Sequence, residues 1–247
     1  MKGRWLEQAM LASGLGPPSS VPRDLCCDIP LALPLTIVTQ RTLSAHAVRD
    51  WLKRGGLRHE VAERDRPLHG CLTARAGVGI IFLDADDHEH ERRFTLAHEA
   101  SHFVLDHLLP REQAIKTFGD KVRPVLDGLR RPTKEEALYS VLDRVPLGLQ
   151  VRLMDRGVRG GVCAWSIEEA EQRADRLAFE MLAPARAVLE SLRPLSRAVG
   201  SVPVAEAASR IAREFGLPAN TAEAYAELLL GKQRSIRTSV LDLFGKR

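Results

Sequence analysis

The chain has 247 residues, of which 45% are hydrophobic and 28% charged, and its formal net charge is +4. This composition excludes a largely disordered chain and suffices for one good-sized core with a small appended domain. The four cysteines include no CxxC pair, which argues against a cysteine-rich structural zinc site and favours a reducing compartment. We expect no signal peptide and no membrane span, and therefore a cytoplasmic protein.

The first third of the chain predicts a short helix, a linker and a small sheet. Residues 1–14 favour a helix, and the glycines and prolines of 14–22 favour a linker. A helix is expected to begin at Ser44 and to end at Gly55. The predicted strands, the last two joined by a tight turn at 75–77, cover residues 34–39, 59–62, 68–73 and 78–83.

Most of the remaining chain predicts helices. An acidic, mobile loop over 84–91 precedes a helix over 92–109 that should end before Pro110. Ser166 matches the first position of a capping box and opens a helix to about Leu182. Residues 134–145 also favour a helix, and 186–247 favour helices broken at Pro194, Pro203, 216–218 and Gly231.

These elements predict an α+β fold with a small β-sheet, zincin-type active-site helices, a helical insertion and an all-helical C-terminal part. The predicted domains are an N-terminal arm and linker over 1–30, a metallopeptidase domain over 31–184 with an insertion over 108–165, and a helix-turn-helix-like region over 185–247.

The chemistry-bearing motif lies on the predicted helix over 92–109. His98, Glu99 and His102 form an HExxH pattern. Histidines four residues apart share one helix face, so both imidazoles can reach one ion, and zinc suits these nitrogen ligands. The glutamate beside the first histidine can take a proton from a zinc-bound water. The motif therefore predicts a zinc peptidase with Glu99 as its base.

A catalytic zinc needs a third protein ligand. The longer HExxHxxGxxH pattern fails, because Leu105 and Leu108 stand at its glycine and its third histidine. Asp106 lies about 12 Å along the helix axis from His98, which is too far for a shared ion.

Glu171 is the best candidate for the third ligand. Asp175 follows it by one helical turn and can accept the second ring N–H of a ligand histidine. Because the gap between His102 and Glu171 is long, Glu168 and Glu169 stay open as alternative ligands.

These residues lie in two segments that resemble the ImmA/IrrE family of metallopeptidases. Residues 93–102 read RFTLAHEASH, close to the end of the family pattern RRFTLAHELGH, and residues 171–184 are similar to its ExxANxFAxxLLMP pattern. Ser101 stands where the family usually has glycine, and Asp175 where it usually has asparagine. The resemblance implies a Zn²⁺-dependent endopeptidase that cleaves a helix-turn-helix repressor or an antitoxin-like regulator, with a role in transcription regulation and stress response.

Two further roles are predicted for a peptidase. The substrate should lie extended along an edge strand near 78–83 and pair with Gly79, Ile80 and Ile81. Tyr139 is a candidate donor to the oxyanion, with a packed helix aromatic as the simpler interpretation.

An alternative function is a non-proteolytic regulatory or DNA-binding protein with a structural zinc. Residues 205–230 resemble a helix-turn-helix unit. The second helix of this unit carries Glu223 and Glu227 without Lys or Arg, whereas a DNA-facing helix should be basic. Packing or substrate docking is therefore favoured over DNA binding.

His88 and His90 are assigned to the acidic loop, and His107 to a structural or exposed position.

Overall fold

The computed structural model describes residues 4–57, 65–142, 145–147, 150–155, 165–199 and 202–244. Two compact units are present: Met1–Gly16 with Asp24–Ala178, and Pro17–Arg23 with Phe179–Arg247. The predicted strand over 59–62 lies outside the described residues.

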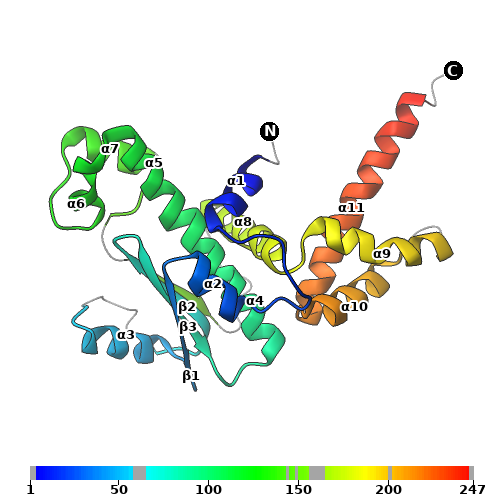
Figure 1. The fold of residues 1–247 in the computed structure, drawn as a ribbon, viewed down its shortest axis with the longest axis horizontal. Helices are drawn as coiled ribbons and strands as arrows, with labels where there is room; N and C mark the ends of the chain where they lie inside the picture. Colours follow the sequence, from blue (N-terminus) through cyan, green and yellow to red (C-terminus); the bar gives the residue numbers. More distant parts are fainter. Residues whose placement is uncertain are drawn as a thin grey trace. The chain divides into compact units, whose positions relative to one another are not determined.

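The first unit is built on a four-stranded sheet (Figure 1). Its strands stand in the order β1-β3-β2-β4, with β1 parallel to β3 and β2 antiparallel to both of its neighbours. Their bounds are β1 (Leu35–Gln40), β2 (Leu68–Arg75), β3 (Val78–Asp84) and β4 (Gln150–Asp155). The predicted turn joins β2 to β3 through Ala76 at φ 55° and Gly77 at φ 83°, as a tight hairpin requires.

The strand β3 lies inside the sheet, so the prediction that it is an edge strand is wrong. Gly79 pairs with Leu35 on one side and Ala74 on the other, and Ile80 and Ile81 are likewise paired on both sides. The sheet thus uses the backbone groups that a substrate would need. A Cβ on Gly79 would lie 2.7 Å from Leu35 and 3.0 Å from Phe103, so this glycine serves close packing.

Helices cover both faces of the sheet. The helices of the first unit are α1 (Arg4–Ser13), α2 (Leu25–Ala32), α3 (Ala45–Arg54), α4 (Glu89–His102), the π-helix η1 (Phe103–Leu108), α5 (Leu109–Phe118), the 3₁₀-helix η2 (Asp120–Val122), α6 (Arg123–Leu126), α7 (Lys134–Leu142) and α8 (Trp165–Leu182), which continues into the second unit.

The helix α3 begins and ends where the sequence predicted. The Ser44 side chain accepts a hydrogen bond from the N–H of Ala47, and the helix stops at Gly55. Its buried residues pack with Cys71 of β2 and Phe82 of β3. Neighbouring residues of a strand face opposite sides of the sheet. Cys71 faces α3, and a Cβ on the preceding Gly70 would lie against α4, so α4 covers the opposite face.

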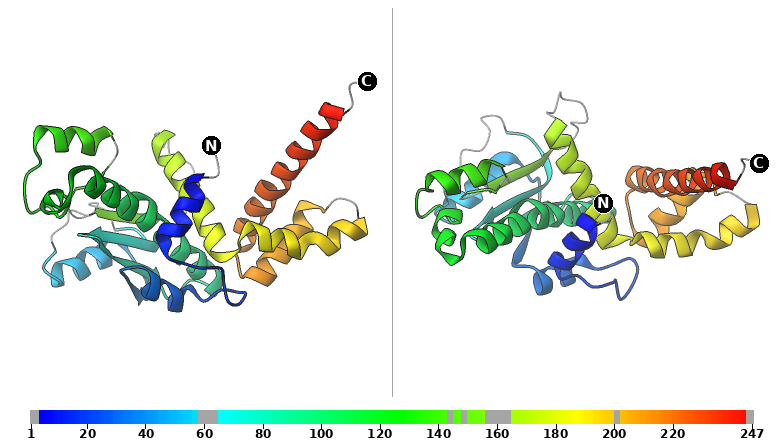
Figure 2. Two further views of the ribbon diagram at one scale, coloured as in Figure 1. Left: turned by 45° about the horizontal axis from the view of Figure 1, so that its top comes forward. Right: turned by 90° about the horizontal axis from the view of Figure 1, so that it is seen from above.

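The active-site helix does not end before Pro110, contrary to the prediction. The helices α4, η1 and α5 follow one another without a gap from Glu89 to Phe118 (Figure 2). Within η1 the N–H of Leu109 bonds to the carbonyl of Val104, five residues back, so the turn is wider than an α-helical turn. This width accommodates Pro110, whose ring would otherwise clash with a carbonyl of the preceding turn.

The second unit is helical, as predicted. It contains the end of α8 together with α9 (Ala185–Val199), α10 (Val204–Phe215) and α11 (Ala219–Phe244). Gly216 ends α10 in the left-handed conformation. The predicted breaks at Pro194 and Gly231 are wrong, since both residues lie inside helices. Among the described helices, none has the length and the apolar character needed to cross a membrane.

Candidate metal centre

Three side chains from two helices converge on one point. The Nε2 atoms of His98 and His102 lie 3.1 Å apart on α4. One carboxylate oxygen of Glu171, on α8, lies 3.2 Å from the first nitrogen and 3.4 Å from the second. This triangle of two nitrogens and one oxygen can hold a metal ion.

The size of the triangle fits one tetrahedral ion. Ligands bonded at roughly 2.0–2.1 Å in tetrahedral geometry stand about 3.3–3.4 Å apart, close to the three observed distances. Three protein donors leave a fourth position for water or substrate, the arrangement of catalytic rather than structural metal sites. Glu171 completes the set, whereas the alternative ligands Glu168 and Glu169 are exposed and lie outside it.

Each histidine turns its second ring nitrogen toward a carboxylate. Nδ1 of His98 lies 2.9 Å from Asp175, at the position expected from the sequence. Nδ1 of His102 lies 2.7 Å from Asp106, a contact that the sequence analysis did not foresee. Both rings can therefore donate from Nδ1 and direct the Nε2 lone pair at a metal, and the carboxylates increase the basicity of the ligands.

The same contacts control the charge of the metal-free site. Burial by itself would lower the pKa of His98, but its hydrogen bonds with Asp175 and Glu171 raise that pKa to about 10. Burial by itself would raise the pKa of Glu171, but its hydrogen bonds with His102 and His98 hold it well below the usual range. A metal that binds here would therefore meet an anionic carboxylate and displace a proton from His98.

Glu99 is held deep in the site by the approach of α4 to the sheet. Its side chain is buried, with 1% exposure. A Cβ on Gly70 of β2 would lie only 2.4 Å from Cγ2 of Thr95 and 3.4 Å from Cγ of Glu99. Only glycine allows this approach, and a glycine inside a strand is the sequence signal that could have revealed it.

The serine at the family's glycine position is accommodated within its own helix. Ser101 is fully buried, and its hydroxyl donates to the carbonyl of Ala97 at 2.7 Å. This bond satisfies the hydroxyl as a donor within the turn of its own helix. This substitution leaves the HExxH geometry intact.

Two other predicted residues lie in structural positions. The ring of Tyr139 packs edge-on against Phe118 at 5.0 Å, and its hydroxyl accepts from Thr117 at 3.4 Å. Its oxyanion role stays a prediction. His107 is buried, accepts from the N–H of Gly77 at 3.1 Å, and has a pKa lowered by burial and then by Arg111.

Hydrogen bonds connect the acidic loop before α4 to neighbouring segments. Asp84 accepts from the N–H of Leu43 at 3.1 Å, and Asp86 accepts from the N–H of Thr42 at 3.0 Å. Asp87 contacts His69 at 2.9 Å. Throughout the described part of the chain, metal-ligand geometry occurs only at the cluster on α4 and α8. The loop thus fixes the connection between β1 and α3.

Comparison with known proteins agrees with this geometry. Residues 58–129 match the family model Peptidase_M78, described as the IrrE N-terminal-like domain. The match includes the HExxH motif and extends through part of the predicted insertion, whereas Glu171 and Asp175 lie beyond it. No curated protein and no solved structure matches the chain. The resemblance predicted from the sequence is therefore confirmed: residues 58–129 are similar to the IrrE N-terminal-like domain of Peptidase_M78, a metal-dependent family, which supports an ImmA/IrrE-type metallopeptidase.

Proposed function

We propose that this protein is a zinc-dependent endopeptidase with Glu99 as its general base. The observation that carries the proposal is the convergence of His98, His102 and Glu171 at 3.1–3.4 Å. Mixed nitrogen and oxygen donors in a three-ligand set favour zinc with an open position. The family match supports peptidase chemistry.

In the proposed mechanism, the metal, Glu99 and the two outer carboxylates have different roles. Bound zinc would supply a Lewis acid that polarises the scissile carbonyl and lowers the pKa of a water. Glu99 takes a proton from the attacking water and passes it to the leaving amine. Asp175 and Asp106 keep both histidines oriented through their Nδ1 contacts.

The strand β4, which with β1 is one of the two edge strands of the described sheet, is our candidate place for an extended substrate. It pairs with β2 on one side, and in the described part of the sheet no strand pairs with its other side. Addition of a strand to such an edge uses backbone hydrogen bonds for affinity and leaves side chains to set specificity. The role that the sequence analysis assigned to Gly79, Ile80 and Ile81 therefore passes to Gln150–Asp155.

The decisive variant is Glu99→Gln, which keeps the shape of the side chain and removes its basicity. We expect unchanged zinc content and abolished cleavage. Glu91→Gln, at a half-buried position of the same helix, is the matched control and should cleave normally. Cleavage by Glu99→Gln at the wild-type rate would refute the assignment of the base.

The substrate class follows from the family resemblance. We propose a helix-turn-helix repressor or an antitoxin-like regulator. Comparison of new protein N-termini in cells that express wild type or Glu99→Gln would identify the substrate. Wild-type-specific cleavage of a regulator supports the proposal, and cleavage restricted to unrelated proteins contradicts it.

The DNA-binding alternative has one structural observation in its favour. The helices α10 and α11 join through Gly216 in a helix-turn-helix arrangement. The start of α11 carries Glu223 and Glu227 and no basic residue up to Leu230, so it would repel phosphates. A salt-dependent shift of DNA by the full chain would support this alternative, and no shift at low salt would exclude it.

A further inference from the structure

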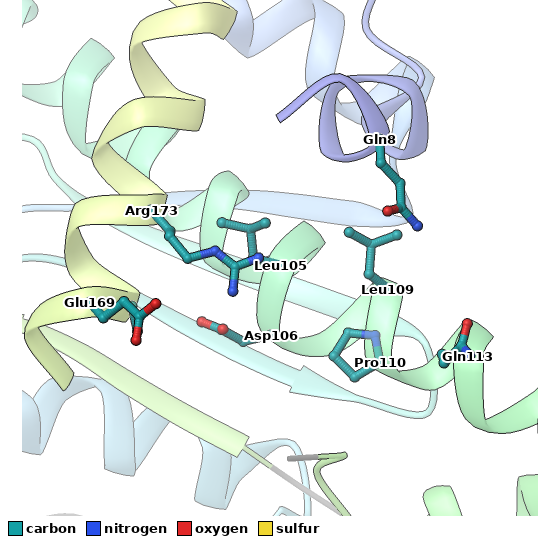
Figure 3. A pocket seen from close by; sticks show the side chains of 9 residues that line it. Gln8, Leu105, Asp106, Leu109, Pro110, Gln113, Glu169 and Arg173 are labelled. Atoms are coloured by element: carbon teal, nitrogen blue, oxygen red, sulfur yellow. The ribbon is translucent and has the colours of Figure 1, made fainter. Parts of the chain in front are cut away.

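A pocket of about 340 Å³ lies beside the candidate metal centre, within the first unit (Figure 3). Three segments far apart in the sequence line it: Gln8 from α1, Leu105 to Gln113 from η1 and α5, and Glu169 to Arg173 from α8. It shares Asp106 with the site, since this carboxylate also contacts His102. A ligand in the pocket therefore lies one side chain away from a metal-ligand histidine.

The Arg173 side chain is presented to the pocket by the N-terminal helix. Its guanidinium carbon lies 4.9 Å from the ring centroid of Trp5 on α1, a cation–π contact. Both views of Figure 2 show α1 beside α8. Within the described residues, no carboxylate or carbonyl accepts a hydrogen bond from this guanidinium. Its face is thus held by an aromatic ring while its edge N–H groups are available to a ligand.

Two carboxylates, Asp106 and Glu169, also line the pocket. Asp106 is already engaged by the ring N–H of His102 at 2.7 Å. Glu169 and Arg173 are both exposed, so water screens both charges. Leu105 and Leu109 supply apolar walls, against which the methylene groups of a side chain can pack.

We propose that this pocket is a side-chain subsite for an acidic residue of the substrate, with Arg173 as the specificity-determining residue. The planar guanidinium matches a carboxylate in a two-pronged hydrogen-bonded pair. The inference rests on the proposed peptidase function. It also gives the N-terminal helix a role in substrate selection through Trp5 and Gln8.

The test uses the full-length, zinc-loaded protein and a positional-scanning library of acetylated hexapeptides. Cleavage is measured with wild type, Arg173→Gln, Arg173→Glu and the control Arg176→Gln. Arg176 lies on the same helix and outside the pocket lining. Binding of the same peptides is measured with zinc-loaded Glu99→Gln, with and without Arg173→Gln, so that recognition is read without turnover.

We expect wild type to prefer Glu or Asp at one position by roughly 2- to 5-fold, the range for an ion pair with a solvent-exposed side chain. Arg173→Gln should lose this preference, Arg173→Glu should replace it with a preference for Lys or Arg, and Arg176→Gln should match wild type. A merely structural role would instead lower the cleavage of all peptides equally.

The outcomes separate this inference from the proposed function. Absence of an acidic preference in wild type, or an unchanged preference in Arg173→Gln, overturns the subsite. If no peptide is cleaved but Glu99→Gln binds acidic peptides in an Arg173-dependent way, the subsite stands and the endopeptidase proposal fails. If no peptide is cleaved or bound, both are overturned.

Discussion

Replacement of Asp175 by Asn tests whether the outer carboxylate of His98 controls metal affinity. The two groups lie 2.9 Å apart, with the histidine side chain 6% exposed and the aspartate 44% exposed. Loss of such a partner commonly weakens metal binding 10- to 100-fold. Because Asn keeps an oxygen acceptor and Asp175 is partly screened by solvent, we expect about a tenfold loss, or about 1.4 kcal/mol. Asp175→Ala removes the acceptor as well and should approach a hundredfold loss.

Competition with a chromogenic chelator at fixed pH measures these affinities directly. Thermal denaturation with excess zinc is an independent measurement, because a tenfold weaker site loses about 1.4 kcal/mol of zinc-induced stabilisation. Asp50→Asn, at an exposed position on α3, is the control and should bind zinc as wild type does. Equal zinc affinity in wild type, Asp175→Asn and Asp175→Ala would refute the reasoning.

Three further predictions concern packing and pH. Gly70→Ala should lower the free energy of unfolding by about 1–3 kcal/mol through its clash with Thr95, as measured by urea unfolding. Adding Thr95→Ser to this variant should restore stability, because it removes the clashing Cγ2 methyl group. The control Gly16→Ala, with open space around it, should have little effect. In zinc-free protein, protonated His98 stabilises the fold, because its pKa is raised from 6.5 to about 10. This stabilisation is fully present below pH 6.5 and is lost as the pH rises through about 10, so the melting temperature should fall over that range. Added zinc should abolish the fall. Tyr225→Phe removes a buried 2.8 Å hydrogen bond to a backbone carbonyl and should lower the free energy of unfolding by about 1–2 kcal/mol without changing zinc affinity.

Local spacing was enough to predict most of the metal centre. Histidines at positions 98 and 102 share a helix face, and a carboxylate one turn after Glu171 shares the face of that ligand. The same spacing relates His102 to Asp106, but Asp106 was weighed only as a ligand and rejected on its distance from His98. Its role as a partner of the nearer histidine follows from the same geometry.

The sheet shows where local reasoning fails. The apolar run of β3 is typical of a strand covered on both faces, which argues for an interior rather than an edge position. Of the two edge strands, β1 and β4, the second is short and follows a loop-rich segment, so no long sequence pattern marks it. The close approach at Gly70 depends on the partner helix and cannot be derived from neighbours in sequence. The helix α2 was not predicted. Asp24 caps its start, but Pro30 lies in its last turn, and a proline there argues against a helix.

The wide turn at η1 sets the rotation of α5 about the helix axis relative to α4. Before it, α4 directs its histidines at the metal centre, and after it, α5 directs Ala114 and Ile115 into a small cluster with Val122 and Val125. Removing one residue from Phe103–Leu108 would restore a regular α-helix and rotate everything downstream by about 100°. The extra residue thus sets the rotation of α5 about the helix axis more than its position along that axis. Single-residue deletions in Phe103–Leu108 should therefore destabilise the protein far more than point substitutions there.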